Sequence, residues 1–273
     1  MNCRIGSFVF TIITFCITGL PHCCGQGLIF SLPEDGSGVE YEGTVIQETV
    51  RPDLQDGREI LTWSRELSIK SVGREHTEYN GELQPCRWIE IKVVTGTSGA
   101  TGIDAGPVGA RIYKVLVPEN KVMSLAVDGE SIPNAVLPIV KGFRRLGEEQ
   151  VEQINSHGLV VYPTLCLLAN YESPTEISES ETVDSVSGQE NFDSRHMKGE
   201  TIRERPDSRS TNTGEFWVSQ DVPFGLAGWS VRVVRELKGS TEERTKFRQI
   251  SSINSEMKVQ NILEAAESEL ITE

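Results

Sequence analysis

The chain has 273 residues, with 26 Lys+Arg against 40 Asp+Glu and a formal net charge of −14. This length allows one large domain or two ordinary ones, each with a buried core. The negative charge argues against nucleic-acid binding, which needs a basic face for the phosphates, and against recruitment by anionic lipid surfaces. We therefore expect no nucleic-acid partner.

Residues 1–27 have the pattern of a signal peptide. Arg4 supplies a positive charge, residues 5–20 are almost wholly apolar or small, and Pro21 ends the run before several small residues. This run is too short for a helix that must cross about 30 Å of hydrocarbon at about 1.5 Å per residue. We expect export to the periplasm or the extracellular space and no membrane span after cleavage. An uncleaved signal that anchors the protein is the alternative.

Four of the six cysteines lie in that signal, so the mature chain keeps Cys86 and Cys166. Two cysteines in an exported chain can form a disulfide. Closing a loop of this size would stabilise the fold by roughly 4 kcal/mol in the chain-entropy model. The alternative is two buried free thiols, and the sequence does not decide between them.

Residues 28–170 begin with alternating apolar and polar side chains, the pattern of half-buried strands. Asn80-Gly81 is typical of a two-residue hairpin turn. Long strands joined by short links predict an antiparallel meander, because parallel neighbours would need long crossovers. Strands longer than the usual five or six residues favour a curved antiparallel sheet or an unclosed β-barrel. The four predicted strands cover 39–50, 58–72, 86–94 and 110–117.

A few short helices complete the predicted mainly β, α+β fold. Residues 119–125 and 137–146 each suit a short helix, and 262–270 suits a C-terminal one. Residues 158–169 are the most apolar stretch of the mature chain, and Pro163 divides them. We expect this stretch to be an interrupted strand or a segment that crosses the sheet face.

Residues 171–215 differ from the rest of the chain. They contain 11 Asp+Glu, five Lys+Arg and only seven hydrophobic residues in a stretch of 45. Such a composition buries too little apolar surface to offset the entropy of ordering. We predict an acidic, disordered insertion here. Residues 28–170 and 216–273 would then form one β-rich domain that the insertion interrupts.

The sequence contains no pattern that points to catalysis or to a bound metal or cofactor. His76, His157 and His196 have no second His or Cys at zinc-ligand spacing, and no nucleophile elbow, phosphate-binding loop or dinucleotide-binding motif occurs. We therefore predict no catalytic, cofactor-binding or metal-binding residues and a role other than catalysis. A hydrolase built on scattered carboxylates is our third choice of function.

One predicted sheet face is apolar enough to line a core or a ligand cavity. Arg65 interrupts it, and the alternatives of packed core and ligand-lined concavity both stay open. The candidate face consists of Leu61, Trp63, Leu67, Ile69, Ile89, Ile91, Val93, Ile112 and Leu116.

Three stretches carry a resemblance to known proteins: Arg87-Trp-Ile-Glu-Ile-Lys-Val, Ile112-Tyr-Lys-Val-Leu-Val-Pro-Glu and Trp217-Val-Ser-Gln-Asp-Val-Pro-Phe-Gly. Together they resemble uncharacterised exported bacterial families that are distantly similar to periplasmic lipoprotein carriers. Those carriers have an unclosed β-barrel lidded by helices and hold acyl chains in its concavity. The resemblance implies a lipid, an acyl chain or another envelope component as the partner. The alternative is a structural or interaction protein with a filled core and no ligand.

Overall fold

The computed structural model of the protein describes residues 27–100, 102–122 and 136–271. The predicted signal peptide lies outside these residues except for its last position. Within them, no helix has both the length and the apolar character needed to cross a membrane.

Twelve strands form one antiparallel sheet in the order β10-β11-β12-β13-β14-β1-β2-β3-β5-β7-β8, and β4 pairs with β3. Strands from both sides of the acidic tract therefore belong to one sheet, joined where β1 pairs with β14. The strands are β1 (Gly38–Val50), β2 (Arg58–Tyr79), β3 (Glu82–Gly99), β4 (Gly102–Asp104), β5 (Arg111–Pro118), β7 (Lys141–Leu146), β8 (Glu152–Gln153), β10 (Thr175–Asp184), β11 (Asn191–Glu204), β12 (Ser208–Val218), β13 (Leu226–Leu237) and β14 (Arg248–Leu263).

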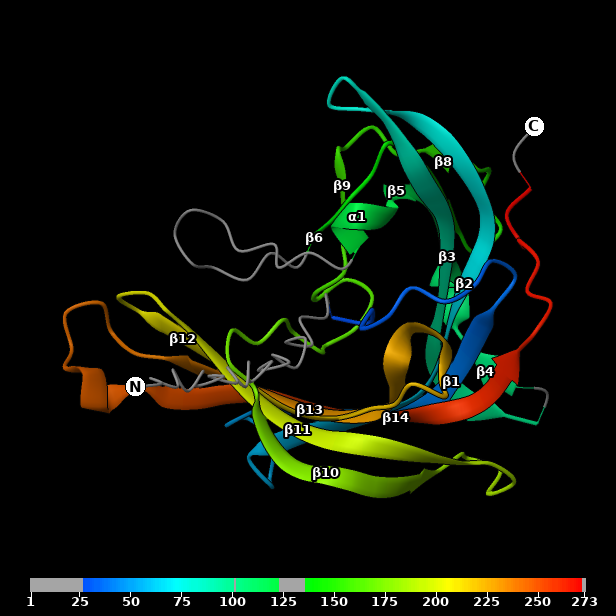
Figure 1. Ribbon diagram of the computed structural model, residues 1–273. Coiled ribbons are helices and arrows are strands. Elements are labelled where there is room, and N and C mark those ends of the chain that lie inside the picture. Colours follow the sequence, from blue (N-terminus) through cyan, green and yellow to red (C-terminus); the bar gives the residue numbers. More distant parts are fainter. Residues whose placement is uncertain (1–26, 101, 123–135, 272–273) are drawn as a thin grey trace, which may run out of the picture.

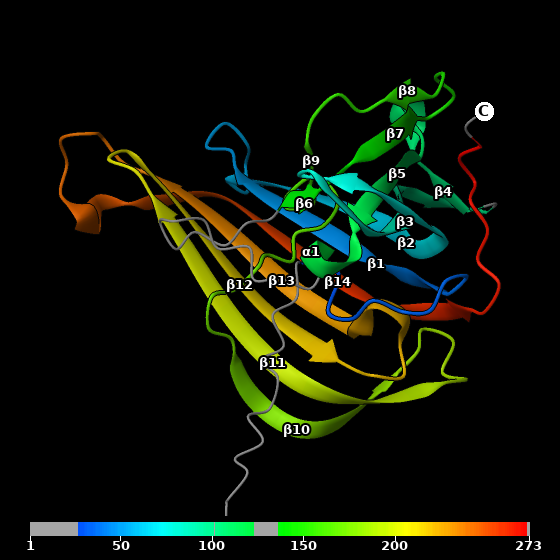
Figure 2. The same ribbon diagram turned by 45° about the horizontal axis from the view of Figure 1, so that its top comes forward.

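The sheet is strongly curved and its edges, β10 and β8, do not meet. Figure 1 shows β2 and β3 standing at a steep angle to β10–β13, and Figure 2 shows the long strands β11–β14 sweeping across the other half. We call the concave face the inner face and the opposite one the outer face. The predicted fold class, mainly antiparallel β with a curved open sheet, is confirmed.

Small elements lie on the inner side of the sheet. Strands β6 (Val136–Pro138) and β9 (Gly158–Val160) form a separate pair, and the helix α1 (Glu119–Val122) lies beside them (Figure 1). Three single-turn 3-10 helices occur elsewhere: η1 (Gly106–Val108), η2 (Pro223–Gly225) and η3 (Arg244–Lys246).

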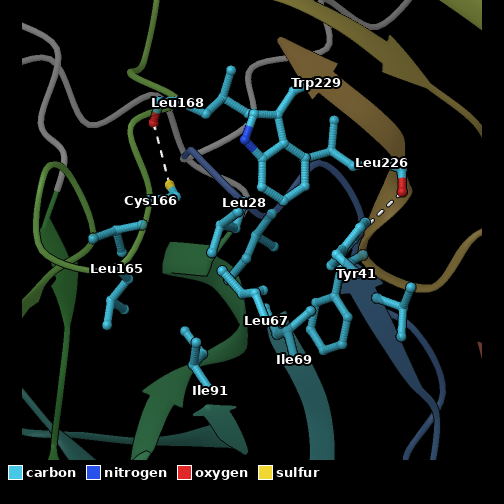
Figure 3. Packing of buried hydrophobic residues seen from close by; sticks show 14 of the residues in the cluster. Leu28, Tyr41, Leu67, Ile69, Ile91, Leu165, Cys166, Leu168, Leu226 and Trp229 are labelled. Atoms are coloured by element: carbon cyan, nitrogen blue, oxygen red, sulfur yellow. Dashed lines mark hydrogen bonds between the residues drawn. The ribbon is translucent and has the colours of Figure 1, made fainter. Parts of the chain in front are cut away.

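The register of the strands places the main apolar residues on the inner face. Tyr41 lies opposite Leu67, and Leu67 lies opposite Val93, so the three form one row across β1, β2 and β3. Trp229 of β13 packs edge-on against the Tyr41 ring at 4.9 Å between centroids. The Tyr41 hydroxyl donates a hydrogen bond of 3.0 Å to the Leu226 carbonyl. The core thus ties the two halves of the curved sheet together (Figure 3).

Two chain segments cover this core from the inner side. Leu28 and Ile29 come from the strand-free N-terminal stretch, and Leu165 and Leu168 come from the stretch after β9; all four are at most 1% exposed. Figure 3 shows Leu28, Leu165 and Leu168 pointing toward the sheet residues. Fully burying such a side chain is worth about 1.5–3 kcal/mol. The predicted interrupted apolar stretch therefore includes a segment that crosses the sheet face.

The β2–β3 hairpin confirms the predicted turn. Asn80 and Gly81 have φ angles of 55° and 83°. This left-handed conformation at both central residues is what a two-residue hairpin turn requires, and Asn and Gly tolerate it best.

The predicted disordered insertion at 171–215 is wrong, because β10, β11 and most of β12 occupy it. Gly199 and Gly214 leave room for Tyr171, whose ring lies where a Cβ at either position would be. Tyr171 also stacks on Phe216 with ring centroids 5.8 Å apart. Strands obtain their order from the backbone ladder and a few such contacts, so a low apolar content did not prevent folding here.

The acidity of the tract has a place in the fold. The outermost strand β10 carries Glu176, Glu179, Glu181 and Asp184. Its pairing with β11 has two register irregularities. Charged side chains and bulges are the usual means by which an exposed edge avoids pairing with another chain. The opposite edge, β8, has only two residues.

Two of the predicted helices are strands or extended chain. Residues 137–146 contribute to β6 and β7, and β7 pairs with β5. Residues 262–270 finish β14 and continue as an extended tail. Of the helix predicted at 119–125, residues 119–122 form the single turn α1, and 123–125 lie outside the described residues. In both corrected segments, 137–146 and 262–270, pairing or contact with distant parts of the chain outweighs a weak helix propensity.

Candidate ligand-binding face

Most of the predicted apolar face belongs to the core. Leu67, Ile69, Ile89, Ile91 and Val93 are at most 1% exposed and belong to the inner cluster. The covering segments described above fill the space next to them. These five residues therefore come together as predicted, as packed core.

Ile112 and Leu116 lie on the outer face, so their assignment to the same face is wrong. Ile112 pairs with Lys92 and Leu116 with Trp88, whereas Tyr113 pairs with the inner-face residue Ile91. Both faces of β5 are apolar because the outer face is also covered, here by the C-terminal tail (red in Figure 1).

Leu61 and Trp63 lie on the inner face but outside the packed cluster. Leu61 is 41% exposed, and Trp63 is half-buried. Ile253 of β14 lies in the same row as Leu61, with Gln47 between them, and is also half-buried. We call Leu61, Trp63 and Ile253 the apolar strip. It extends the apolar inner face beyond the segments that cover the core.

Arg65 lies between this strip and the core, two residues from Trp63 on the same face of β2. Its Nε donates a hydrogen bond of 2.9 Å to Thr95 Oγ1. Burial lowers the pKa of the Arg65 guanidinium, and the positive charge of Arg111 lowers it further. Among the described residues no carboxylate forms an ion pair with Arg65. The guanidinium is thus partly desolvated beside a like charge.

Arg111 belongs to the same inner surface on the far side of β3. It lies opposite Val93, which is two residues from Thr95 along β3, so Arg65 and Arg111 face each other diagonally. Its Nη1 donates to the Thr164 carbonyl over 3.3 Å. No ion pair joins Arg111 to an acid in the described part of the chain. We call these two residues the arginine pair.

The outer face of the same strands is closed by the tail. The Glu90 side chain is 1% exposed, and its carboxylate accepts hydrogen bonds from Ser268 Oγ at 2.6 Å and from the Glu269 and Leu270 amides at 2.9 and 3.2 Å. Glu269 in turn pairs with Lys70 and Lys92, each at 2.7 Å.

The disulfide left open by the sequence is not formed, and Cys86 and Cys166 are buried free thiols. Burial raises the pKa of the Cys166 thiol to about 12. It also raises the pKa of Cys86. Cys166 belongs to the inner cluster, whereas Cys86 shares the strand parity of Trp88 and Glu90 on the outer face. The sheet therefore separates the two sulfur atoms, and burial disfavours the thiolate form in which a cysteine reacts.

The histidines do not assemble into a site. His76 and His157 are both exposed. His196 stacks on Trp217 at 4.7 Å between ring centroids, and its Nδ1 lies 2.9 Å from a Glu181 oxygen. No group of His, Cys, Asp and Glu among the described residues could hold a metal ion.

The sequence pattern indicated some residues of these two faces and gave no indication of others. Arg65 stood out because it interrupts an apolar alternation. Arg111 gave no such signal, since β5 is apolar on both faces and its register cannot be read from spacing. The tail contacts of Glu90 join residues about 180 positions apart, and no local pattern encodes them.

The chain matches no protein-family model, and no curated protein is significantly similar to it. The resemblance to lipoprotein carriers therefore stays a prediction. The chemistry of the inner face has to be argued from its own side chains.

Proposed function

We propose that this protein binds the apolar chain of a lipid or another amphiphile along the apolar strip, and that its role is not catalytic. The observation that carries the proposal is the exposure of Leu61, which is 41% exposed on the inner, concave face of a sheet. Large apolar side chains gathered on a concave surface are typical of ligand-binding sites.

The strip, and not the whole inner face, is the proposed site. The five core residues of the candidate face have their neighbours supplied by the N-terminal stretch and the stretch after β9. Leu61, Trp63 and Ile253 keep accessible surface among the described residues. A chain laid there would bury apolar surface worth about 25 cal/mol per Å².

We also propose that the protein acts outside the cytoplasm, in the periplasm or the extracellular space, because of the signal-peptide pattern at its N-terminus. A lipid or an envelope component would be available as a ligand there.

The test compares adjacent residues on opposite faces of β2. Ile60 is 64% exposed and Leu61 is 41% exposed, so a charge at either position should leave the fold intact. Wild-type protein and the variants I60D and L61D would be purified from a native-like host and examined by native mass spectrometry with lipid extraction. We expect co-purifying lipid with the wild type and I60D and its loss from L61D. Wild-type protein without bound lipid would contradict the proposal.

A second candidate function is a structural or interaction protein with a filled core. It is favoured by the covering segments, which fill the inner cluster with the chain's own side chains. A groove on the outer face, lined by Glu40, Ser68, Lys92 and Glu269 among others, would be its natural contact surface. Retention of a specific envelope protein by the wild type, without lipid, would support this function instead.

A further inference from the structure

We propose that Arg65 and Arg111 bind the anionic headgroup, a carboxylate or a phosphate, of the ligand whose chain lies on the apolar strip. This inference rests on the proposed function and adds the ligand's charge and orientation to it.

Within the residues that the structure describes, the arginine pair has no carboxylate partner. The chain has 40 acidic residues, and every Lys and Arg of β2 and β3 other than Arg65 forms an ion pair with one of them. Arg87, for example, donates two hydrogen bonds to Glu119 Oε1 at 3.1 and 2.9 Å. Arg65 and Arg111 instead contact a threonine hydroxyl and a backbone carbonyl.

Without a ligand, the arginine pair is energetically unfavourable. A buried cation is unfavourable unless it is paired, and a second cation beside it makes it more so. An anion between the two guanidinium groups would remove both penalties. Arginine is well suited to this, since its planar fork matches carboxylate and phosphate oxygens.

The arginine pair is also well placed relative to the apolar strip. Arg65, Trp63 and Leu61 lie at alternate positions on the same face of β2. At about 3.3 Å per residue, Arg65 and Leu61 are about 13 Å apart along the strand. A headgroup at Arg65 therefore lets an extended chain follow Trp63 and Leu61 toward the end of the strand.

The net charge of −14 does not oppose such a site. Charges farther away than about 8 Å are largely screened at physiological ionic strength. The protein would be a poor binder of anionic membrane surfaces, as its composition predicts, and would still hold one anionic group between two arginines.

The experiment separates headgroup from chain. Binding of decanoate, 1-decanol, decyltrimethylammonium and inorganic phosphate to the full protein would be measured by isothermal titration calorimetry. The variants are R65Q, R111Q and the charge-conserving R65K. The control is R232Q, which removes an exposed arginine from the outer face of β13. Urea unfolding would establish that each variant is folded.

We expect the wild type to bind decanoate at least about tenfold more tightly than 1-decanol and to bind decyltrimethylammonium most weakly. R65Q and R111Q should each lose about tenfold in affinity for decanoate and little for 1-decanol, because a charge-assisted hydrogen bond is lost. R65K should lie between R65Q and the wild type, and R232Q should match the wild type.

Equal affinity for decanoate and 1-decanol would overturn the headgroup site and leave the proposed function standing. Binding of phosphate that depends on Arg65, without binding of any decyl compound, would keep an anion site and overturn the proposed function. Binding of no probe at all would overturn both.

Discussion

The two faces of the curved sheet each carry a pair of basic residues, and the two pairs differ in their ion-pair partners. On the outer face Lys70 and Lys92 share the carboxylate of Glu269, at 2.7 Å each. On the inner face Arg65 and Arg111 share no carboxylate among the described residues. One cation pair shares a carboxylate of the chain's own tail, and the other lies beside a partly exposed apolar strip.

This difference distinguishes a structural surface from a binding surface. The outer pair is part of a closed contact in which Glu90, Glu269 and Leu270 satisfy neighbouring polar groups. The inner pair carries an energetic cost that folding alone does not explain. Groups held at such a cost are commonly functional, because their partner is supplied from outside.

The largest expected effect belongs to the outer face. Replacing Glu90 with alanine should lower the free energy of unfolding by about 3 kcal/mol, because the buried amides of Glu269 and Leu270 would lose their acceptor. Urea unfolding measures this loss. The control is E66A, an exposed glutamate on the same face of β2, which should change stability by less than about 0.5 kcal/mol. A similar loss in both variants would show that the tail contact is unimportant.

Glu269 should have a smaller effect that depends on pH. Burial opposes ionisation of its carboxyl, but hydrogen bonds from Lys70 and Lys92 more than offset this and lower its pKa below the usual 4.5. The E269Q variant should lose about 1 kcal/mol of stability near neutral pH, a modest value because the side chain is partly exposed and screened.

The sign of the pH dependence follows from the lowered pKa. The contribution of Glu269 should be fully present above about pH 4.5 and should disappear as the pH falls through the folded-state value. Urea midpoints of wild type and E269Q should therefore converge in acid. A difference that stays constant down to pH 3 would contradict the ion-pair explanation.

The smallest effect on stability is expected on the inner face. R65Q removes a partly desolvated charge that has no acid partner among the residues the structure describes, so it should change the free energy of unfolding by no more than about 0.5 kcal/mol. K70Q, which breaks the pair of a buried lysine with Glu269, should cost about 1–2 kcal/mol. If R65Q were as destabilising as K70Q, the inner pair would be structural and the contrast between the faces would be lost.

The sequence predicted the strands with strong alternation and failed where order depends on distant contacts. β1, β2 and the Asn80-Gly81 turn follow from local patterns. The order of 171–215 depends on Tyr171 packing over two glycines of neighbouring strands, and composition cannot report such a contact. The tail at 262–270 has helix-compatible residues, but its amides bind Glu90 from β3.

The candidate site was also predicted only in part, because some of its residues are marked by a local pattern and others come together only through distant strand pairing. Arg65 was visible as an interruption of an apolar alternation, and Leu61 and Trp63 were placed on its face correctly. Ile112 and Leu116 were assigned to the wrong face. In a strand that is apolar on both faces, the sequence does not show which side chains point to the inner face. Arg111 joins the site only through the register of β3 and β5.

The most direct test of the central claim is the effect of decanoate on stability. A ligand that binds only the folded protein raises its free energy of unfolding by RT ln(1 + L/Kd), where L is the free ligand concentration. We predict that decanoate raises the urea midpoint of the wild type and of R232Q, and that 1-decanol raises it less. In R65Q the two ligands should have the same small effect. An unchanged wild-type midpoint, or an equal decanoate shift in R65Q, would contradict the account.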